Sequence, residues 1–350
     1  MSETLFSRLS VYLTGSYEHG TWLSVDGQVV MNIRNGESRA PILDNFLGSC
    51  LSAVNLLNAE SYVDARKVLS GACGQLREII ETEDPLTLHY FMETFSNMLR
   101  NKTPALVQVV DIIRRYIGKM AMTVIAKDHP WRDICCLLGT IESEQLEGAI
   151  LQTFNCIATV FGEKLGPLHT NTFAARLECV KIKYIGYLPG AELAMRGFLD
   201  ECKKEEEADP RYVGGVSIPQ TLQVMSSLTF NLISQGRLEE AEKLALDYYE
   251  RSVASNDTTS TVRALLLTAR AQHRQGKNDL AVYYQRAAVT LNVELGKEYL
   301  IWAVAHLTEL EKWYREWGRI EEADAAWLEI KGLVDSENAE EDLVEEITEN

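Results

Sequence analysis

A short motif occurs three times in the C-terminal half of the chain at nearly constant spacing. The copies span Gln235–Ala241, Gln275–Ala281 and Trp317–Ala323, and each has glycine as its second residue and alanine as its last. Their glycines lie at positions 236, 276 and 318, so the spacing is 40 and then 42 residues. Self-similarity at this period is typical of helical repeat arrays, which restricts the fold to stacked helix pairs.

Each copy has the chemistry of a tight turn between two helices. Glycine adopts the left-handed conformation that ends a helix, and the polar or acidic residues after it suit the first turn of the next helix. The alanine is small enough to let the second helix approach the first. Apolar residues at helical spacing precede the turns, such as Met225, Leu228 and Leu232 before the first. The residues predicted to define the repeats are Gly236, Ala241, Gly276, Ala281, Gly318 and Ala323.

Linkers rich in proline and histidine extend the pattern toward the N-terminus. Four such linkers contain Asp84-Pro85, His129-Pro130, the segment Leu165–Thr170 and Asp209-Pro210. When they are aligned with one another, the equivalent positions are 84, 129, 169 and 209. This spacing predicts an array over residues 46–334 with about seven repeats. His129 and His169 occupy equivalent positions in these linkers. We therefore expect both histidines to cap or pack at a turn and not to catalyse a reaction.

These motifs resemble the tetratricopeptide repeat, and the period near 42 residues is similar to the long repeats of kinesin light chains. The resemblance implies an all-α fold, a right-handed superhelix of helix-turn-helix units. It also implies that the first helices of successive pairs line a concave groove that binds a peptide or protein segment.

A second resemblance concerns the order of motifs along the chain. Trp22 follows a Tyr-Glu-His-Gly turn, and Leu56-Leu57-Asn58 leads into Val63–Arg66 before the linkers. This order is similar to the helical region of fungal proteins with a cryptic-loci-regulator-type, Myb-like DNA-binding domain. The resemblance implies a role in transcription regulation. The basic DNA-binding module of that family has no match here, because residues 1–45 contain only Arg8, Arg34 and Arg39 as bases.

Charge and composition narrow the function classes. The net charge of −17 disfavours direct binding of nucleic acid by this chain. The sequence has no run of 18 apolar residues, so it predicts no membrane-spanning helix. Its first residues lack the pattern of a signal peptide. We therefore expect a nuclear or cytoplasmic protein that is not secreted. The seven cysteines include the adjacent pair Cys135-Cys136 and no Cys-x-x-Cys, which predicts reduced thiols, mostly buried.

Motifs for catalysis, cofactors and metals are missing from the sequence. It has no phosphate-binding Gly-Lys-Ser/Thr loop, no Gly-x-Ser-x-Gly elbow and no His-Glu-x-x-His zinc motif. We therefore expect no catalytic residues, no cofactor and no metal, and a protein that is not an enzyme.

The two ends of the chain differ from the repeats. Residues 1–45 are rich in turn formers, with a helical pattern only from Leu5 to Leu13 and a short strand or apolar strap at Val29–Ile33. We predict that this segment caps the array. Residues 335–350 hold eight acidic residues and no Lys or Arg, which predicts a disordered acidic tail. The alternative is a tail that competes for a basic surface.

The register set by the turn glycines also predicts the residues that line the groove. The candidates are Arg263, Arg270, His273, Lys312 and Arg315, preceded by Gln223 and Phe230. A row of bases favours an acidic peptide or a C-terminal carboxylate, which Arg binds bidentately. Alternatively, the bases pair with nearby acids on the helix surface or with the acidic tail. Four tryptophans, at 302, 313, 317 and 327, are expected to pack in the core, or else to form a partner surface.

The sequence therefore favours a non-enzymatic interaction scaffold for an acidic protein or peptide partner. Two alternatives remain open. One is a structural repeat domain that forms a homodimer, and the other is a regulator that senses a small molecule or peptide in an enclosed apolar pocket.

Overall fold

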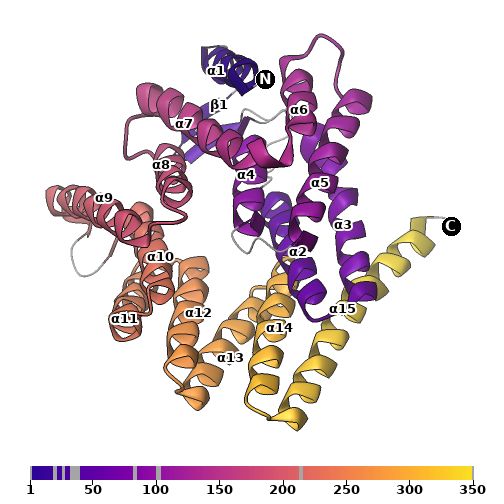
Figure 1. Ribbon diagram of the computed structural model, residues 1–350, viewed down its shortest axis with the longest axis vertical. Coiled ribbons are helices and arrows are strands. Elements are labelled where there is room, and N and C mark those ends of the chain that lie inside the picture. Colours follow the sequence, from indigo (N-terminus) through magenta and orange to yellow (C-terminus); the bar gives the residue numbers. More distant parts are fainter. Residues whose placement is uncertain are drawn as a thin grey trace. The chain divides into compact units, whose positions relative to one another are not determined.

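The computed structural model describes residues 2–18, 22–25, 28–31, 40–81, 85–99, 104–212 and 216–348, and it is helical apart from one short hairpin (Figure 1). The all-α class is confirmed. The helices are α1 Ser2–Glu18, α2 Ala40–Asn58, α3 Tyr62–Glu81, α4 Pro85–Leu99, α5 Pro104–Val124, α6 Pro130–Thr140, α7 Leu146–Leu165, α8 Thr170–Lys183, α9 Leu188–Ala208, α10 Pro219–Ser234, α11 Leu238–Ala254, α12 Thr258–Arg274, α13 Asn278–Glu294, α14 Leu300–Glu316 and α15 Ile320–Thr348.

Short elements complete the description. Strand β1 (Trp22–Val25) pairs antiparallel with β2 (Gln28–Met31), so part of the predicted strand at Val29–Ile33 is confirmed. Three 3₁₀ turns lie at Ser143–Gln145, Pro210–Tyr212 and Lys297–Tyr299. The predicted turns around His19, Gly20 and Asn35-Gly36 lie outside the described residues.

The chain forms two compact units, each assembled from separate stretches of sequence. Unit 1 comprises Met1–Leu47, Ser70–Tyr212 and Ile218–Val224, and unit 2 comprises Gly48–Leu69, Val213–Ser217 and Met225–Asn350. This division differs from the predicted sequence of cap (1–45), array (46–334) and tail (335–350). The reason lies in the tertiary structure: the end of α2 and the start of α3 (Gly48–Leu69) pack with helices from the end of the chain.

In unit 2, helices α11 to α15 pack in sequence order, each against the next (Figure 1, orange to yellow for α12 to α15). The predicted turns between them have the expected geometry, because Gly236, Gly276 and Gly318 have φ values of 77°, 74° and 73°. In each turn the residue after the glycine donates its N–H to a carbonyl five residues back, the bond that closes a Schellman motif. These bonds are Arg237 to Leu232, 3.0 Å, Lys277 to Gln272, 3.0 Å, and Arg319 to Tyr314, 2.9 Å.

The alanines after these turns lie in the core, as predicted. Ala241, Ala281 and Ala323 are all 0% exposed. Ala281 and Ala323 share a cluster with Leu310 and Trp313, where a larger side chain would push neighbouring helices apart.

Two more turns adopt the same geometry without glycine. Asn256 and Glu60 have φ values of 54° and 60°, and the residue after Glu60, Ser61, donates to the Leu56 carbonyl at 2.9 Å. Glu60 is followed by the fully buried Ala65 at the same interval that separates Gly236 from Ala241. The α2–α3 turn is therefore a further copy of the motif, which the sequence conceals because glutamate occupies the left-handed position at a cost of about 1 kcal/mol.

Within unit 2, α2 packs closely on the start of α14. A Cβ atom on Gly48 would lie 3.0 Å from side-chain atoms of both Ile301 and Trp302. The Ser52 hydroxyl donates to the Ile301 carbonyl at 3.1 Å. Small residues on α2 thus bring residues from the early part of the chain against the last helix pair.

In unit 1, the N-terminal helix α1 packs against α6 and α7. Leu5, Leu9 and Leu13, spaced four residues apart, are at most 1% exposed, so the helix predicted from Leu5 to Leu13 is confirmed. Tyr12 stacks on Trp131 with ring centroids 5.9 Å apart. The contacts of α1 are thus with helices in the middle of the sequence, whereas we predicted a cap on the first repeat near residue 46.

Helices α5 and α6 cross at two glycines. A Cβ atom on Gly139 would lie 3.3 Å from the Cα of Gly118. The buried Arg114 guanidinium donates to the carbonyls of Leu138 and Gly139 at 3.1 Å each, and to Asp111 at 2.8 Å. The crossing and this charged cap at the end of α6 fix α5 in unit 1.

The two linker histidines cap helices, as predicted. The Nδ1 atom of His129 accepts from the Trp131 N–H at the start of α6, and that of His169 accepts from the Asn171 N–H at the start of α8, each at 3.3 Å. Their equivalence along the sequence reflects an equivalent structural role.

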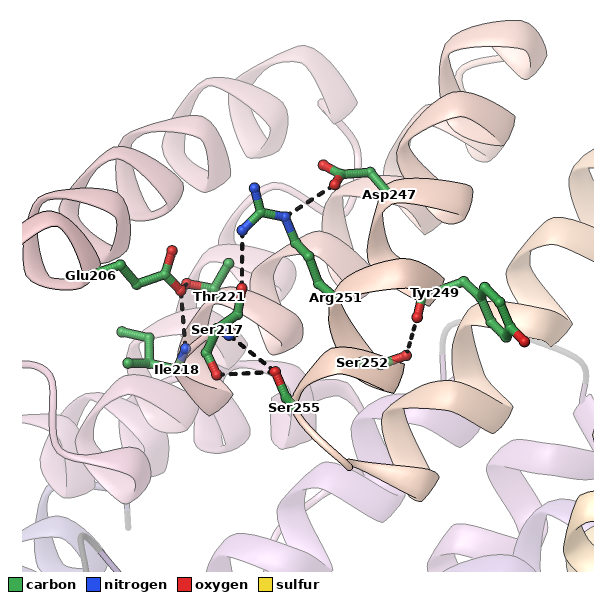
Figure 2. A network of polar contacts seen from close by, with 9 residues as sticks. All are labelled: Glu206, Ser217, Ile218, Thr221, Asp247, Tyr249, Arg251, Ser252 and Ser255. Carbon is green, nitrogen blue, oxygen red and sulfur yellow. Dashed lines mark hydrogen bonds and ion pairs between the residues drawn. The ribbon is translucent and has the colours of Figure 1, made fainter. Parts of the chain in front are cut away.

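Side chains also hold the linker that precedes α10 (Figure 2). In unit 1, the Glu206 carboxylate accepts from the Ile218 N–H at 2.9 Å and the Thr221 hydroxyl at 2.6 Å, which favours a helix start there. In unit 2, the Ser217 N–H donates to the Ser255 hydroxyl and Arg251 donates to the Ser217 hydroxyl, both at 3.0 Å. These contacts have a structural role.

The backbone of the acidic C-terminal segment is helical. Helix α15 runs without a break from Ile320 to Thr348, so it includes most of the segment 335–350 that we expected to be disordered. Within the described residues, none of the helices has the length and apolar character needed to span a membrane.

Candidate peptide-binding face

Helices α12 and α14 carry five of the predicted groove residues. Helix α12 begins where Asp257 accepts from the Ser260 N–H at 2.9 Å, and both helices end at a left-handed glycine. Helix α13 packs against both. We call the surface formed by Arg263, Arg270, His273, Lys312 and Arg315 the α12–α14 face.

Arg270 joins the two helices through a bidentate ion pair with Glu309. The two N–O distances are both 2.8 Å, and the side chains are 36% and 23% exposed. Burial disfavours the charged form of Glu309, but the charge and hydrogen bonds of Arg270 outweigh it and lower the pKa of the carboxyl. Because the pair is partly exposed, its net contribution to stability is about 1 kcal/mol. Much of the Arg270 charge is therefore balanced within the chain.

His273 and Lys312 share one carboxylate. The His273 ring stacks on Trp313 with centroids 4.5 Å apart, and its Nε2 lies 3.5 Å from Glu316. The Lys312 Nζ lies 3.9 Å from the other oxygen of Glu316. Burial lowers the pKa of His273 despite the nearby glutamates, so the ring is neutral near pH 7.

The remaining bases of the face differ in how far they are neutralised. Arg315 pairs with Glu311 and also with Asp324 of α15 at 3.1 Å. Arg263 is exposed and makes no ion pair within the described part of the chain. Lys312 keeps 71% of its side chain exposed. Arg263 and Lys312 therefore supply most of the positive charge that is accessible on this face.

Phe230 and Gln223 lie on α10 but belong to different units. Phe230 is in unit 2, is 44% exposed, and precedes Gly236 by the interval that separates Arg270 and Lys312 from their glycines. Gln223 is in unit 1, and its Oε1 is buried without a hydrogen-bond partner among the described residues. Phe230, Arg270 and Lys312 thus hold one repeat position on three first helices.

Of the four tryptophans expected in the core, Trp313 is buried, and Trp302, Trp317 and Trp327 are partly buried. Trp313 is 4% exposed and lies in a cluster with Ala281 and Leu310. Trp327 packs against the cluster that contains Leu307, and Trp317 packs against that of Trp313. These aromatic side chains therefore contribute to the packing of unit 2.

The sequence analysis included the alternative that these bases pair with acids, but it did not identify the acids. Two were detectable, since Glu311 and Glu316 lie four residues from Arg315 and Lys312, the spacing of helical ion pairs. Glu309 was not, because its partner Arg270 lies 39 residues away. Near it, Gln285 donates to the His306 carbonyl at 3.0 Å, and burial lowers the pKa of His306 to about 4.

Comparison with known proteins identifies no relative: no family model, no curated protein and no solved structure matches this chain. The described residues contain no group of three or more His, Cys, Asp or Glu side chains able to hold a metal ion. Any function must therefore be argued from the chain's own surfaces.

Proposed function

We propose that this protein is a non-enzymatic scaffold that binds a protein segment on the α12–α14 face. The proposal includes the finer architecture implied by the tetratricopeptide resemblance, a right-handed superhelix of about seven repeats. One observation carries it: Phe230, Arg270 and Lys312 occupy the same repeat position on three first helices, where Phe230 and Lys312 are exposed and Arg270 is partly exposed. Successive first helices then present a continuous row of contacts to an extended ligand.

The chemistry of the face restricts the ligand. Arg263 and Lys312 attract carboxylates, but Glu316 lies beside Lys312 and Glu309 pairs with Arg270, and both glutamates repel a densely acidic segment. Phe230, at the equivalent repeat position on α10, offers an exposed apolar contact. The best ligand is therefore a peptide with one or two spaced carboxylates and an aromatic or aliphatic residue.

Selection of peptides on the full chain tests this proposal. A displayed library of short random peptides should yield sequences with spaced acids and an apolar residue. The double variant Arg263→Glu, Lys312→Glu should lose their binding about tenfold or more, because it reverses the accessible charges. The variant Arg270→Glu is unsuitable, since it would place two carboxylates together at Glu309.

A matched control keeps the result specific. Lys243→Glu reverses an exposed charge on α11 without touching the face. Selected peptides should bind this variant as they bind the parent chain. If no sequence is enriched, or if all three proteins bind the peptides equally, the face is not a binding site.

The cellular setting is part of the same proposal. The resemblance to fungal cryptic-loci-regulator-type proteins supports a partner in transcription regulation, in the nucleus or the cytoplasm. Purification of the native protein should recover regulatory partners whose association is lost in the Arg263→Glu, Lys312→Glu variant. Companions that persist in this variant bind elsewhere.

A further inference from the structure

The outer side of α5 in unit 1 is an exposed face that combines apolar and basic residues. Ile112, Tyr116 and Met122 are 63%, 37% and 51% exposed, and the exposed Arg115 and Lys119 lie among them. We call these five residues the α5 face. The opposite side of the helix supplies the core, where Ile113, Ile117 and Ala121 are at most 2% exposed. The packing of this helix on the core therefore does not depend on the apolar residues of the α5 face.

The charge of this face is opposite to that of the whole chain. Residues 112–127 contain no acid, although the chain carries a net charge of −17. The buried Arg114 is engaged by Asp111 and by the end of α6. Arg115 and Lys119, in contrast, form no ion pair within the described ranges. The α5 face is thus suited to an acidic ligand with apolar residues.

The chain itself contains a segment of that chemistry. Residues 335–350 hold eight acids and no base, and Ala339, Leu343 and Ile347 recur at every fourth position. The backbone is helical to Thr348, and residues at this spacing share one side of a helix. The segment is therefore acidic in sequence, and its helical backbone places positions 339, 343 and 347 on one side.

The continuity of α15 limits what this helix can reach. At about 1.5 Å per residue, the helical part after Val334 extends roughly 20 Å further along the axis of α15. A continuous helix cannot fold back onto α12 and α14 beside its own beginning. Competition of the acidic segment for the α12–α14 face of the same chain, our earlier alternative, is therefore disfavoured.

We propose that the acidic end of α15 docks on the α5 face of a second copy of this chain. The apolar stripe of residues 339, 343 and 347 packs on Ile112, Tyr116 and Met122, and the acids flank Arg115 and Lys119, as in other complexes of an amphipathic helix with a groove. The opposite charges accelerate association and make it sensitive to salt. This contact uses a surface in unit 1 and does not depend on the α12–α14 face.

Light scattering of the full chain tests the self-association. The mass should rise with concentration at low salt and fall back toward that of one chain at high salt. Two variants should each weaken association about tenfold or more: Arg115→Glu with Lys119→Glu, and Leu343→Ser with Ile347→Ser. The control Lys203→Glu with Lys204→Glu makes the same change in net charge on α9 and should associate like the parent chain.

Mixing the two variants gives the decisive measurement. The first keeps an intact acidic helix and the second keeps an intact α5 face, so together they should form a complex that neither forms alone. Circular dichroism establishes that both variants are folded. A parent chain that stays monomeric at all concentrations, association that persists in either variant, or a mixture without a complex would each overturn the proposal.

Discussion

A pair of glycine-to-alanine substitutions in unit 2 tests the physical basis of the repeat turns. Gly276 has a φ of 74°, and a Cβ added there would meet no atom within 4 Å. Gly332 lies inside α15 without a positive φ, and its Cβ would also have open space. The same chemical change therefore differs between the two sites only in backbone conformation.

The expected effects have opposite signs. At Gly276 the left-handed conformation costs an alanine about 1–2 kcal/mol, and the stiffer unfolded chain offsets roughly 0.4–1 kcal/mol, so the net loss is about 1 kcal/mol. At Gly332 alanine gains roughly 0.5–1 kcal/mol, because glycine is the weaker helix former. The two variants should differ by about 1.5–2 kcal/mol. Gly276→Asn should fall between them, since Asn256 already adopts this conformation at φ 54°.

Urea denaturation followed by circular dichroism and tryptophan fluorescence measures the difference. Four tryptophans of the last helix pair report on unit 2 directly. The slope of each transition must stay unchanged for the midpoints to give free energies. If Gly276→Ala is as stable as Gly332→Ala, the left-handed turn does not limit the sequence there and the reasoning about repeat turns is refuted.

Three further experiments have definite expected outcomes. Leu9→Ala, which empties a site that is 0% exposed between α1 and its neighbours, should lower the free energy of unfolding by about 2–5 kcal/mol in urea titrations. Burial lowers the pKa of His306 to about 4, so its protonation favours the unfolded state and stability should fall as the pH drops from 6.5 toward 4. Between pH 7 and pH 5 the parent chain should therefore lose about 2 kcal/mol more than His306→Gln, and equal losses would show that this ring does not titrate as described. A double-mutant cycle with Arg270→Ala and Glu309→Ala should give a coupling free energy of unfolding of about 1 kcal/mol that declines in high salt. A coupling free energy of zero would show that the ion pair does not stabilise the fold.

Features with a local cause were predictable from the sequence. The turn at Gly276 needs a residue that tolerates positive φ, so the glycine in the sequence indicates the turn. The capping roles of His129 and His169 followed from their equivalent places before two helices. Helix α1 was visible because its leucines recur at helical spacing.

Features that depend on distant contacts were not predictable. The α2–α3 turn uses Glu60 where other copies have glycine, so the pattern was hidden although the geometry is the same. The partner of Arg270 lies on another helix, and no local spacing connects it to Glu309. The ion pairs of Arg270 and Arg315 agree with the alternative interpretation, in which the bases of the predicted row pair with nearby acids.

The sequence by itself determined the all-α class, the glycine turns at 236, 276 and 318 and the first helix, because these depend on the conformation of each residue and the spacing of its near neighbours. Only the tertiary structure decided which surfaces remain available. It placed α2 on the start of α14, buried Trp313, and left Arg263, Lys312 and the α5 face exposed. The physical reason is that burial and charge pairing depend on residues brought together from distant parts of the chain, which local patterns do not specify.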